Sequence, residues 1–377
     1  MIAVTAKHIL IGGQWVSDQA LLIENGKISA IRDRTQIASG IELKDFGDTY
    51  LAPGLFDIQV NGGGDVLLND EPTVGGLLAI AKAHQKFGTT SLLPTLITDT
   101  FETMRQAAAA VAEARAQGRH QIKGIHFEGP FLNTARKGVH HAPYIREFEN
   151  RFLDLLDEFD LGAVLVTLAP ENVPPEFIKG LRARDVVLSM GHTTANFETA
   201  KAAITQGVTG LTHLFNAMPP FLSREPGPIG AAFEDTRSFA SVIADGHHIH
   251  PSTLKTALQL LGPDRSILIT DAMPPVGGMG SGFKLMDLDI LVEDGRCQTA
   301  DGTLAGACIS MWDAVQYCRQ TLNFSIEDCL QMASATPARF MGLGSQIGTL
   351  QQGYDADFIC FSPDGRILNT HLATEFK

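Results

Sequence analysis

The segment from residue 122 to residue 140 carries a carboxylate and histidines in positions suited to chemistry. Glu128 ends a short apolar run, and the Gly129-Pro130 pair that follows prevents a strand or a helix from continuing. His140 comes soon afterwards in the same segment. A carboxylate at a strand end on a sharp turn, with histidines nearby, is suited to metal binding or catalysis. A solvated surface glutamate fits this segment equally well, so the rest of the chain has to decide.

Three other apolar, strand-like runs also end in reactive side chains, namely His192, His213 and Asp271. Each of these residues alone is more often a hydrogen-bonded structural group than a ligand. Taken with Glu128, however, the two imidazoles match a catalytic zinc site, which has three protein ligands and an open position for water. Asp271 is then left over as the natural general base.

These side chains require a scaffold that brings distant strand ends together. Apolar runs alternate with helix-like segments along the middle of the chain, and the runs lie at about 55–60, 89–95, 122–128, 162–168, 186–191, 209–214, 240–245 and 266–271. Helix signals lie between them, such as an N-cap at Asp99 and a closing glycine at Gly207. This alternation predicts a (β/α)8 barrel, in which the active site forms at the carboxyl ends of the strands. A doubly wound sheet fits the alternation too, but no Gly-x-Gly-x-x-Gly turn follows the first strand.

Strand-like segments also occur at both ends of the chain, outside this alternating region. Asn25-Gly26 separates two apolar-rich runs and is a strong hairpin signal, and the segment from 348 to 365 has similar runs and turns. The sequence therefore predicts a small β-sandwich domain built from residues 1–52 plus 345–377, attached to a barrel of residues 53–344.

The composition limits the classes of function. A formal net charge of -13 argues against a general binder of nucleic acid or of anionic membranes, although a few local cations could still hold a small anionic substrate. The five cysteines all lie in the last quarter without close pairing, which predicts reduced thiols in a cytoplasmic protein. No run approaches the roughly 18 apolar residues of a membrane span, and the N-terminal sequence lacks the pattern of a secretory signal.

Six motifs follow one another along the chain: His126-Phe-Glu-Gly-Pro130, Gly191-His192-Thr, Thr212-His-Leu-Phe-Asn-Ala-Met218, Arg224-Glu-Pro-Gly227, Asp245-Gly-His-His248 and Thr270-Asp271-Ala. This ordered set resembles that of the N-acetylglucosamine-6-phosphate deacetylases, a family of the amidohydrolase superfamily. Two further segments, beginning at Leu51 and Gly348, resemble the superfamily's junctions between β domain and barrel. The resemblance implies hydrolysis of N-acetylglucosamine 6-phosphate to glucosamine 6-phosphate and acetate.

The end of the first strand departs from the superfamily pattern. Many amidohydrolases have His-x-His at this place and bind a second metal there, whereas this chain has Gln59 and Asn61. An amide side chain is a poor zinc ligand beside imidazole or carboxylate. We therefore expect one divalent ion per subunit, held by Glu128, His192 and His213. Zn²⁺ is the expected ion, and Fe²⁺ and Co²⁺ are alternatives that the same ligands could hold.

The resemblance also assigns residues around the substrate. Asp271 would act as general acid and base, and His140 would contact the substrate and polarise its carbonyl group. Arg224 would reach the phosphate in the neighbouring subunit's active site, which implies a homodimer. The remaining substrate-binding positions are Asn216, Ala217, His248 and three residues of a loop expected to close over the sugar, Leu304, Ala305 and Gly306.

Two other functions fit parts of the same pattern. A different amidohydrolase, such as a dihydroorotase-like enzyme or an N-acyl amino acid hydrolase, would use the same metal chemistry, and dependence of turnover on the substrate phosphate would separate it. A non-enzymatic relative would keep the fold as an assembly module. Such relatives usually lose metal ligands, whereas Glu128, His192, His213 and Asp271 are all present here.

Overall fold

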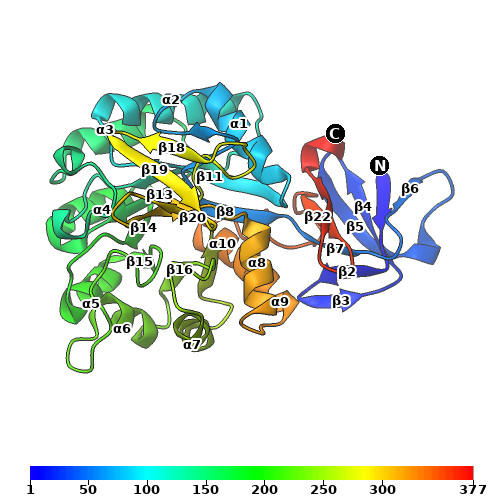
Figure 1. Cartoon of the computed structure of the whole chain (residues 1–377). Coiled ribbons are helices and arrows are strands. Elements are labelled where there is room, and N and C mark those ends of the chain that lie inside the picture. The colour runs from blue at the N-terminus through cyan, green and yellow to red at the C-terminus, as the bar shows by residue number, and fades with distance from the viewer. Residues whose placement is uncertain (377) are drawn as a thin grey trace.

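Eight parallel strands form a closed barrel in the larger part of the molecule, on the left in Figure 1. The computed structural model describes residues 1–376. The strands are β8 (Leu55–Val60), β11 (Thr89–Ile97), β12 (Gly124–Glu128), β13 (Ala163–Leu168), β14 (Val187–Met190), β15 (Val208–Leu211), β16 (Phe239–Ile243) and β17 (Ser266–Ile269). Each pairs with the next along the chain. The barrel closes between its last and first strands, where the backbone N of Asp271 donates to the carbonyl oxygen of Gln59 at 3.0 Å. The predicted (β/α)8 barrel is confirmed.

The barrel strands are rich in apolar residues because both of their faces are buried. All nine residues of β11 are buried, for example. Successive side chains of a strand point to opposite faces. Leu92 accordingly packs with helix residues such as Leu77 and Met104, whereas Leu93 packs with Phe56 of the neighbouring strand in a separate cluster. One apolar layer therefore attaches the helices, and the other fills the barrel interior.

Ten helices follow from local signals in the sequence: α1 (Val74–Gln85), α2 (Phe101–Ala116), α3 (Asn150–Glu158), α4 (Pro175–Arg182), α5 (Phe197–Gln206), α6 (Gly227–Glu234), α7 (Pro251–Leu261), α8 (Met311–Gln320), α9 (Ile326–Ala333) and α10 (Ala335–Phe340), counted within residues 1–376. Asn196 caps α5, and Gly207 ends it in the left-handed conformation, as expected. The predicted cap of α2 was wrong by one residue. Thr100 receives the backbone N–H of Thr103 at 3.1 Å, and Asp99 instead accepts from the backbone N of Thr100. Within the same 376 residues, no helix is long and apolar enough to span a membrane.

Both chain ends contribute to a second, smaller unit made of two sheets (Figure 1). One sheet contains β5 (Lys27–Asp33), β4 (Gln19–Glu24), β1 (Ile2–Thr5) and β6 (Glu42–Asp45), and the other contains β23 (Ile367–His371), β22 (Phe358–Phe361), β7 (Tyr50–Pro53), β2 (His8–Ile11) and β3 (Gln14–Val16). Strand β22 pairs with β7, so the C-terminal segment completes a sheet begun by the N-terminal one. One apolar cluster, which includes Leu21 and Phe358, joins the two sheets. The β-sandwich part of the fold prediction is confirmed, and the domain boundaries at residues 52 and 345 stay a prediction.

A four-stranded antiparallel sheet between β17 and α8 was not predicted. It consists of β18 (Gly282–Leu285), β19 (Leu288–Glu293), β20 (Arg296–Gln298) and β21 (Leu304–Ala307), which lie across the barrel as yellow strands in Figure 1. The expected loop at 304–306 is thus a strand. It is held to the barrel because Ala307 N donates to Asp271 O at 2.9 Å and Met273 N donates to Ala307 O at 3.0 Å. Asp294-Gly295, both with positive φ, forms one of its hairpin turns.

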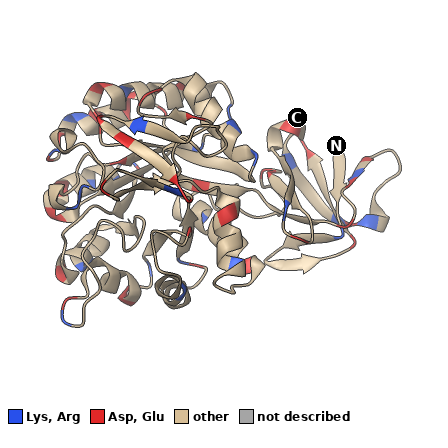
Figure 2. Cartoon of the chain, viewed as in Figure 1, with Lys and Arg blue, Asp and Glu red and all other residues tan. Residues whose placement is uncertain are grey.

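Smaller elements complete the chain: β9 (Gly62–Gly63) and β10 (Val66–Leu67) after the first barrel strand, and the 3-10 turns Arg34–Gln36, Thr134–Arg136, Ala142–Tyr144, Pro170–Asn172 and Ala373–Phe376. Lys and Arg are scattered among Asp and Glu over both parts of the molecule (Figure 2). An anionic ligand would therefore have to find individual cations rather than a broad basic face.

Asp57 in β8 should make the stability of the fold depend on pH. Its side chain is fully buried, and burial raises its pKa to about 7, against hydrogen bonds from Thr270 and from the backbone of Gln59 that lower it. The folded state therefore binds this proton more tightly than the unfolded state, so the stabilisation is complete below about pH 4 and is lost as pH rises through about 7. We therefore compare the unfolding free energy of Asp57→Asn with that of the wild type. The difference in favour of the variant should grow by up to about 4 kcal/mol as the pH rises from 4 to 8.

Urea denaturation of both proteins across this pH range would measure the effect. The relevant quantity is the difference in unfolding free energy between the two proteins, which cancels the titration of all other groups. A difference that does not change with pH would contradict the assignment.

Candidate metal centre and active site

The structure brings Glu128, His192, His213 and Asp271 to one cavity of about 330 Å³ at the carboxyl ends of the barrel strands. Glu128 is the last residue of β12, and each of the others comes two residues after its strand. His192, His213 and Asp271 have φ values of 48°, 33° and 50°. This left-handed conformation is unfavourable for residues other than glycine, and such strain is concentrated at functional sites. The left-handed conformation turns the chain sharply after three of the strands, at the place where these side chains meet.

Three donor atoms within this group lie close enough to share one metal ion. His213 Nε2 is 3.0 Å from Glu128 Oε1, His192 Nε2 is 3.3 Å from the same oxygen, and the two imidazole nitrogens are 3.1 Å apart. Ligand atoms about 2.0–2.1 Å from a tetrahedral zinc ion are separated by about 3.3 Å. The donor types and the spacing therefore both fit a Glu/His/His site for a divalent ion. His192 Nδ1 also donates to the backbone oxygen of Arg136 at 2.9 Å, an outer contact that fixes the ring.

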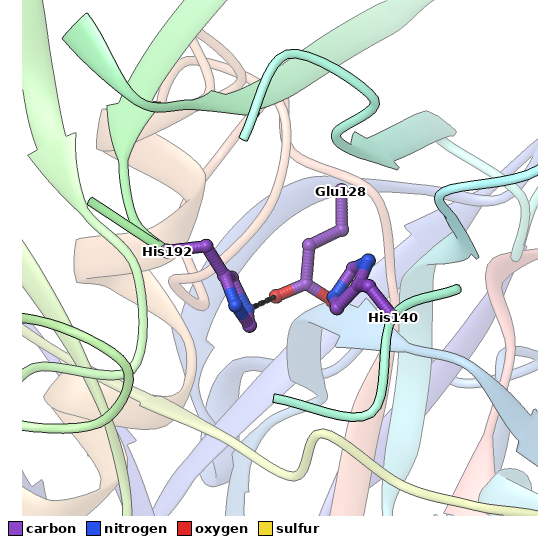
Figure 3. A group of neighbouring side chains, drawn as sticks. All are labelled: Glu128, His140 and His192. Carbon is purple, nitrogen blue, oxygen red and sulfur yellow. Dashed lines mark hydrogen bonds and ion pairs between the residues drawn. The ribbon is translucent and has the colours of Figure 1, made fainter. Parts of the chain in front are cut away.

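A second, overlapping set of donors includes His140. Figure 3 shows the imidazoles of His140 and His192 on either side of the Glu128 carboxylate, and the donor atoms of these three residues lie within 4.8 Å of one another. His140 Nε2 is 4.0 Å from Glu128 Oε2, farther than either nitrogen of the first set. The set with His213 is therefore the tighter one. His140 lines the same cavity.

The charges in this cluster depend on one another. Burial alone would raise the pKa of Glu128, but hydrogen bonds and charge from His192 and His213 outweigh it and hold that pKa well below its usual value. Burial tends to lower the pKa of His213, yet its hydrogen bond to Glu128 raises it overall. For His140, burial lowers the pKa to about 3, and the nearby His192 adds to the effect, so this ring is neutral. The buried carboxylate thus has its compensating partners within the cluster.

Asp271 lies beside this cluster and is held by the two amide side chains of β8 and its end. Gln59 Nε2 donates to Asp271 Oδ1 at 3.1 Å and to Glu128 Oε1 at 3.0 Å, and Asn61 Nδ2 donates to the same Asp271 oxygen at 2.6 Å. Both amides therefore act as donors, and Gln59 links the two carboxylates. Because they bind Oδ1, Oδ2 is left without an amide donor. Burial, and then the charge of Glu128, raise the pKa of Asp271.

Most of the predicted substrate-binding residues line the same cavity, namely His140, Asn216, Ala217, His248, Leu304 and Gly306. His248 Nδ1 donates to Asp245 Oδ2 at 2.6 Å, which leaves Nε2 available. Asn216 uses its amide nitrogen on the backbone oxygens of His213 and Leu214, so its amide oxygen is the freer group. A Cβ atom at Gly306 would lie 2.7 Å from the backbone oxygen of Asp271, which explains why glycine stands at this position of β21.

Two predicted residues do not line the cavity of this chain. Ala305 is buried in an apolar cluster on the other face of β21. Arg224 is exposed in the segment from 221 to 225, together with Phe221 and Leu222, which are 55% and 54% exposed. Within one copy of residues 1–376, Arg224 therefore does not reach the cavity.

Sequence reasoning missed several residues of the site. Arg136 lines the cavity and makes no ion pair within residues 1–376. Its place in the segment between Glu128 and His140 is a signal that could have identified it. Met273 and Ile97 form apolar parts of the wall. Thr98, which follows β11, is hydrogen-bonded to His140, and the rule used for the other strand ends could have found it.

Comparisons with known proteins agree with this geometry. The amidohydrolase family matches residues 50–376. An N-acetylgalactosamine-6-phosphate deacetylase from Shewanella is 41% identical over 325 residues, covering 86% of this chain and 82% of the relative. An N-acetylglucosamine-6-phosphate deacetylase from Haemophilus influenzae is 32% identical over 367 residues, covering 96% of this chain and 95% of the relative. The crystal structure of N-acetylglucosamine-6-phosphate deacetylase from Pasteurella multocida superimposes with a TM-score of 0.95 at 31% identity, covering 99% and 98% of the two chains.

The chain therefore belongs to the amidohydrolase family, whose members are metal-dependent hydrolytic enzymes. The resemblance to the amino-sugar phosphate deacetylases within that family, which the motifs predicted, is confirmed.

Proposed function

We propose that this enzyme removes the acetyl group of N-acetylglucosamine 6-phosphate, releasing glucosamine 6-phosphate and acetate. The observation that carries the proposal is the convergence of Glu128, His192 and His213 with Asp271 in one cavity. The relatives that cover most of this chain are deacetylases of 6-phosphorylated N-acetylhexosamines, which supports the substrate class.

One divalent ion per subunit, Zn²⁺ in our proposal, would be held by Glu128, His192 and His213. Such an ion lowers the pKa of water and polarises a carbonyl group. Gln59 and Asn61 support a single ion, because their amide nitrogens are engaged with Glu128 and Asp271 as hydrogen-bond donors. The donor set alone does not separate Zn²⁺ from Fe²⁺ or Co²⁺, which elemental analysis of the purified protein would do.

The chain's own residues supply the proton transfers. Asp271 Oδ2 would take a proton from the attacking water, since the amides of Gln59 and Asn61 occupy Oδ1. As the carbon–nitrogen bond breaks, Asp271 would deliver that proton to the sugar nitrogen, which then leaves as an amine. His140 would donate from Nε2 to the carbonyl oxygen as negative charge develops on it.

An acetate-release assay would test the proposed function. The substrates to compare are N-acetylglucosamine with and without the 6-phosphate, each with and without a chelator. We expect rapid release only from the phosphorylated sugar and loss of activity on chelation. Equal turnover without the phosphate, or preference for dihydroorotate or an N-acyl amino acid, would contradict the proposed substrate.

N-Acetylgalactosamine 6-phosphate is a second candidate substrate. The specific reason is that a deacetylase of this sugar phosphate is 41% identical to the chain, whereas the Haemophilus deacetylase of the gluco epimer is 32% identical. The two sugars differ only at one hydroxyl group, so the metal and proton chemistry is unchanged. Comparing kcat/KM for the two epimers in the same assay would decide between them.

Arg224 should bind the substrate phosphate across a homodimer. Its guanidinium is exposed beside Phe221 and Leu222, two large apolar side chains that a second copy could cover. Hydrogen bonds between charged groups contribute about 1.5–3 kcal/mol, so we expect Arg224→Ala to raise KM for the phosphorylated sugar by roughly 10- to 150-fold. Steady-state kinetics would measure this. Arg237→Ala is a matched control, because Arg237 is an exposed arginine already paired with Asp235. An unchanged KM for Arg224→Ala would contradict the role.

Mixing two impaired variants would show whether Arg224 acts across the dimer, if activity is assayed at a substrate concentration far below the KM of Arg224→Ala. A subunit with Arg224→Ala keeps its own Asp271, and a subunit with Asp271→Asn keeps its Arg224. If the arginine reaches the partner, a mixed dimer contains one complete active site and is more active than either variant alone. If it acts within its own subunit, no mixed dimer contains a complete site and mixing gives no gain in activity.

We also place the enzyme in the cytoplasm. All five cysteines are free, and four of them are buried. Free thiols are typical of proteins in a reducing compartment. Secretion of the full-length protein with oxidised cysteines would contradict this placement.

A further inference from the structure

Thr98, the first residue after β11, contacts Nδ1 of the cavity residue His140. Its side-chain oxygen lies 2.9 Å from His140 Nδ1 and 3.3 Å from the backbone oxygen of Glu128. The side chain is only 2% exposed, so bulk water does not compete for these contacts. Thr98 does not line the cavity itself. Any effect of Thr98 on the reaction must therefore pass through His140 or Glu128.

Gly129 leaves the space that this arrangement needs. A Cβ atom at residue 129 would lie 2.2 Å from Thr98 Oγ1, far inside the van der Waals distance, and its φ of +88° also favours glycine. The turn after Glu128 is therefore shaped around the hydroxyl of Thr98. This gives the Gly129 position a specific reason beyond ending the strand.

The contacts of His140 indicate which of its nitrogens carries the proton. A neutral imidazole has one N–H, and the partner of one nitrogen determines the tautomer. Thr98 has a single proton, which it can give to His140 Nδ1 or to the carbonyl oxygen of Glu128. The first contact has a normal hydrogen-bond length, whereas 3.3 Å between two oxygens is longer than usual.

The other side of the ring faces the cavity. His140 Nε2 lies 4.0 Å from Oε2 of the Glu128 carboxylate. When Thr98 donates to Nδ1, the single proton of the neutral ring is on Nε2 and is directed to this side.

We propose that Thr98 is a positioning residue that donates its hydroxyl proton to His140 Nδ1 and thereby keeps the ring proton on Nε2, directed into the cavity. This inference deepens the proposed function. The effect that we expect on the reaction rate rests on that function. An N–H on Nε2 can stabilise negative charge on the substrate carbonyl oxygen, whereas a lone pair there would repel it. The opposite tautomer would make Nε2 a metal ligand instead, which the cluster of Glu128, His140 and His192 would permit.

Nitrogen NMR of histidine-labelled, Zn²⁺-loaded protein would read the tautomer directly. We expect wild type and Thr98→Ser to show His140 with the proton on Nε2, and Thr98→Val to show a mixture of tautomers. Thr98→Ala serves the same purpose if the valine variant does not fold. A wild-type ring protonated on Nδ1, or a valine variant with the wild-type tautomer, would overturn the proposal. This measurement needs no substrate, so it decides the proposal even if the assay of acetate release contradicts the proposed function.

Kinetics would show whether the tautomer matters for the reaction. Loss of one donor to a developing oxyanion costs about 100- to 1,000-fold in kcat, and a ring that still samples the active tautomer should lose less, roughly 10- to 100-fold. KM should change little, because the contact strengthens in the transition state, and Thr98→Ser should restore kcat. The matched control is Thr89→Val in β11, the strand that Thr98 follows, because the buried hydroxyl of Thr89 has no hydrogen-bond partner within residues 1–376. An equal loss of kcat in both variants would overturn the proposal, since packing of β11 would then explain it.

Discussion

Replacing Asp271 with asparagine is expected to lower kcat by about 1,000-fold, equivalent to ~4 kcal/mol of transition-state stabilisation. The physical reason is that an amide can neither take a proton from water nor return one to the leaving nitrogen. The change should preserve geometry, because the asparagine oxygen can still accept the hydrogen bonds that Gln59 and Asn61 give to Asp271 Oδ1. Steady-state kinetics on the phosphorylated sugar would measure the loss.

The interpretation depends on what Asp271→Asn leaves unchanged. Its metal content should match that of the wild type, since Asp271 is not among the proposed ligands, and KM should change little because substrate contacts remain. Loss of the metal would mean that Asp271 is a ligand. A kcat within tenfold of the wild type would remove it from the role of general acid and base.

The barrel could be predicted because its physical signals are local. A parallel strand covered on both faces is buried along its length, so the eight strands appear as apolar-rich runs between helices. The barrel topology alone then predicts that reactive residues at the ends of these strands lie close together. The four residues so identified, Glu128, His192, His213 and Asp271, do meet in one cavity.

The sheet from β18 to β21 was missed because its signals are weak. Its strands are short, and β18 and β19 have only one buried residue each, so they do not form apolar runs. The resemblance to known deacetylases drew attention to residues 303–306 as a loop, although Asp294-Gly295 was a hairpin signal of the same kind as Asn25-Gly26.

Other features of the site depend on contacts that no local pattern contains. The role of Thr98 exists only because His140 returns to it across 42 residues. The amide chemistry of Gln59 and Asn61 was enough to exclude them as good metal ligands. Their hydrogen bonds to Asp271, and the second hydrogen bond from Gln59 to Glu128, appear only in three dimensions. Arg224 does not line the cavity of its own chain, so the role proposed for it requires a second copy of the chain.

Replacing Glu128 with alanine is expected to empty the metal site. Glu128 Oε1 is the oxygen that both His192 Nε2 and His213 Nε2 approach, at 3.3 and 3.0 Å. Loss of an outer hydrogen bond to a metal ligand already costs about 10- to 100-fold in affinity, so loss of a direct ligand should cost more than about 100-fold. Elemental analysis after gel filtration should find one equivalent of metal in the wild type and none in Glu128→Ala. Acetate release should fall to the level of chelated wild type.

A stability measurement separates loss of the ion from general damage to the barrel. Bound metal stabilises the folded state by mass action, so adding metal to the stripped wild type should raise its Tm, whereas Glu128→Ala and Glu128→Gln should not respond. Asp57→Asn is the matched control for the glutamine variant, because it makes the same chemical change at a buried carboxylate that does not line the cavity. It should keep both its metal and its response. A Glu128→Ala protein that retains one equivalent would show that His140 completes the site in its place, and two equivalents in the wild type would show that Gln59 or Asn61 supports a second ion.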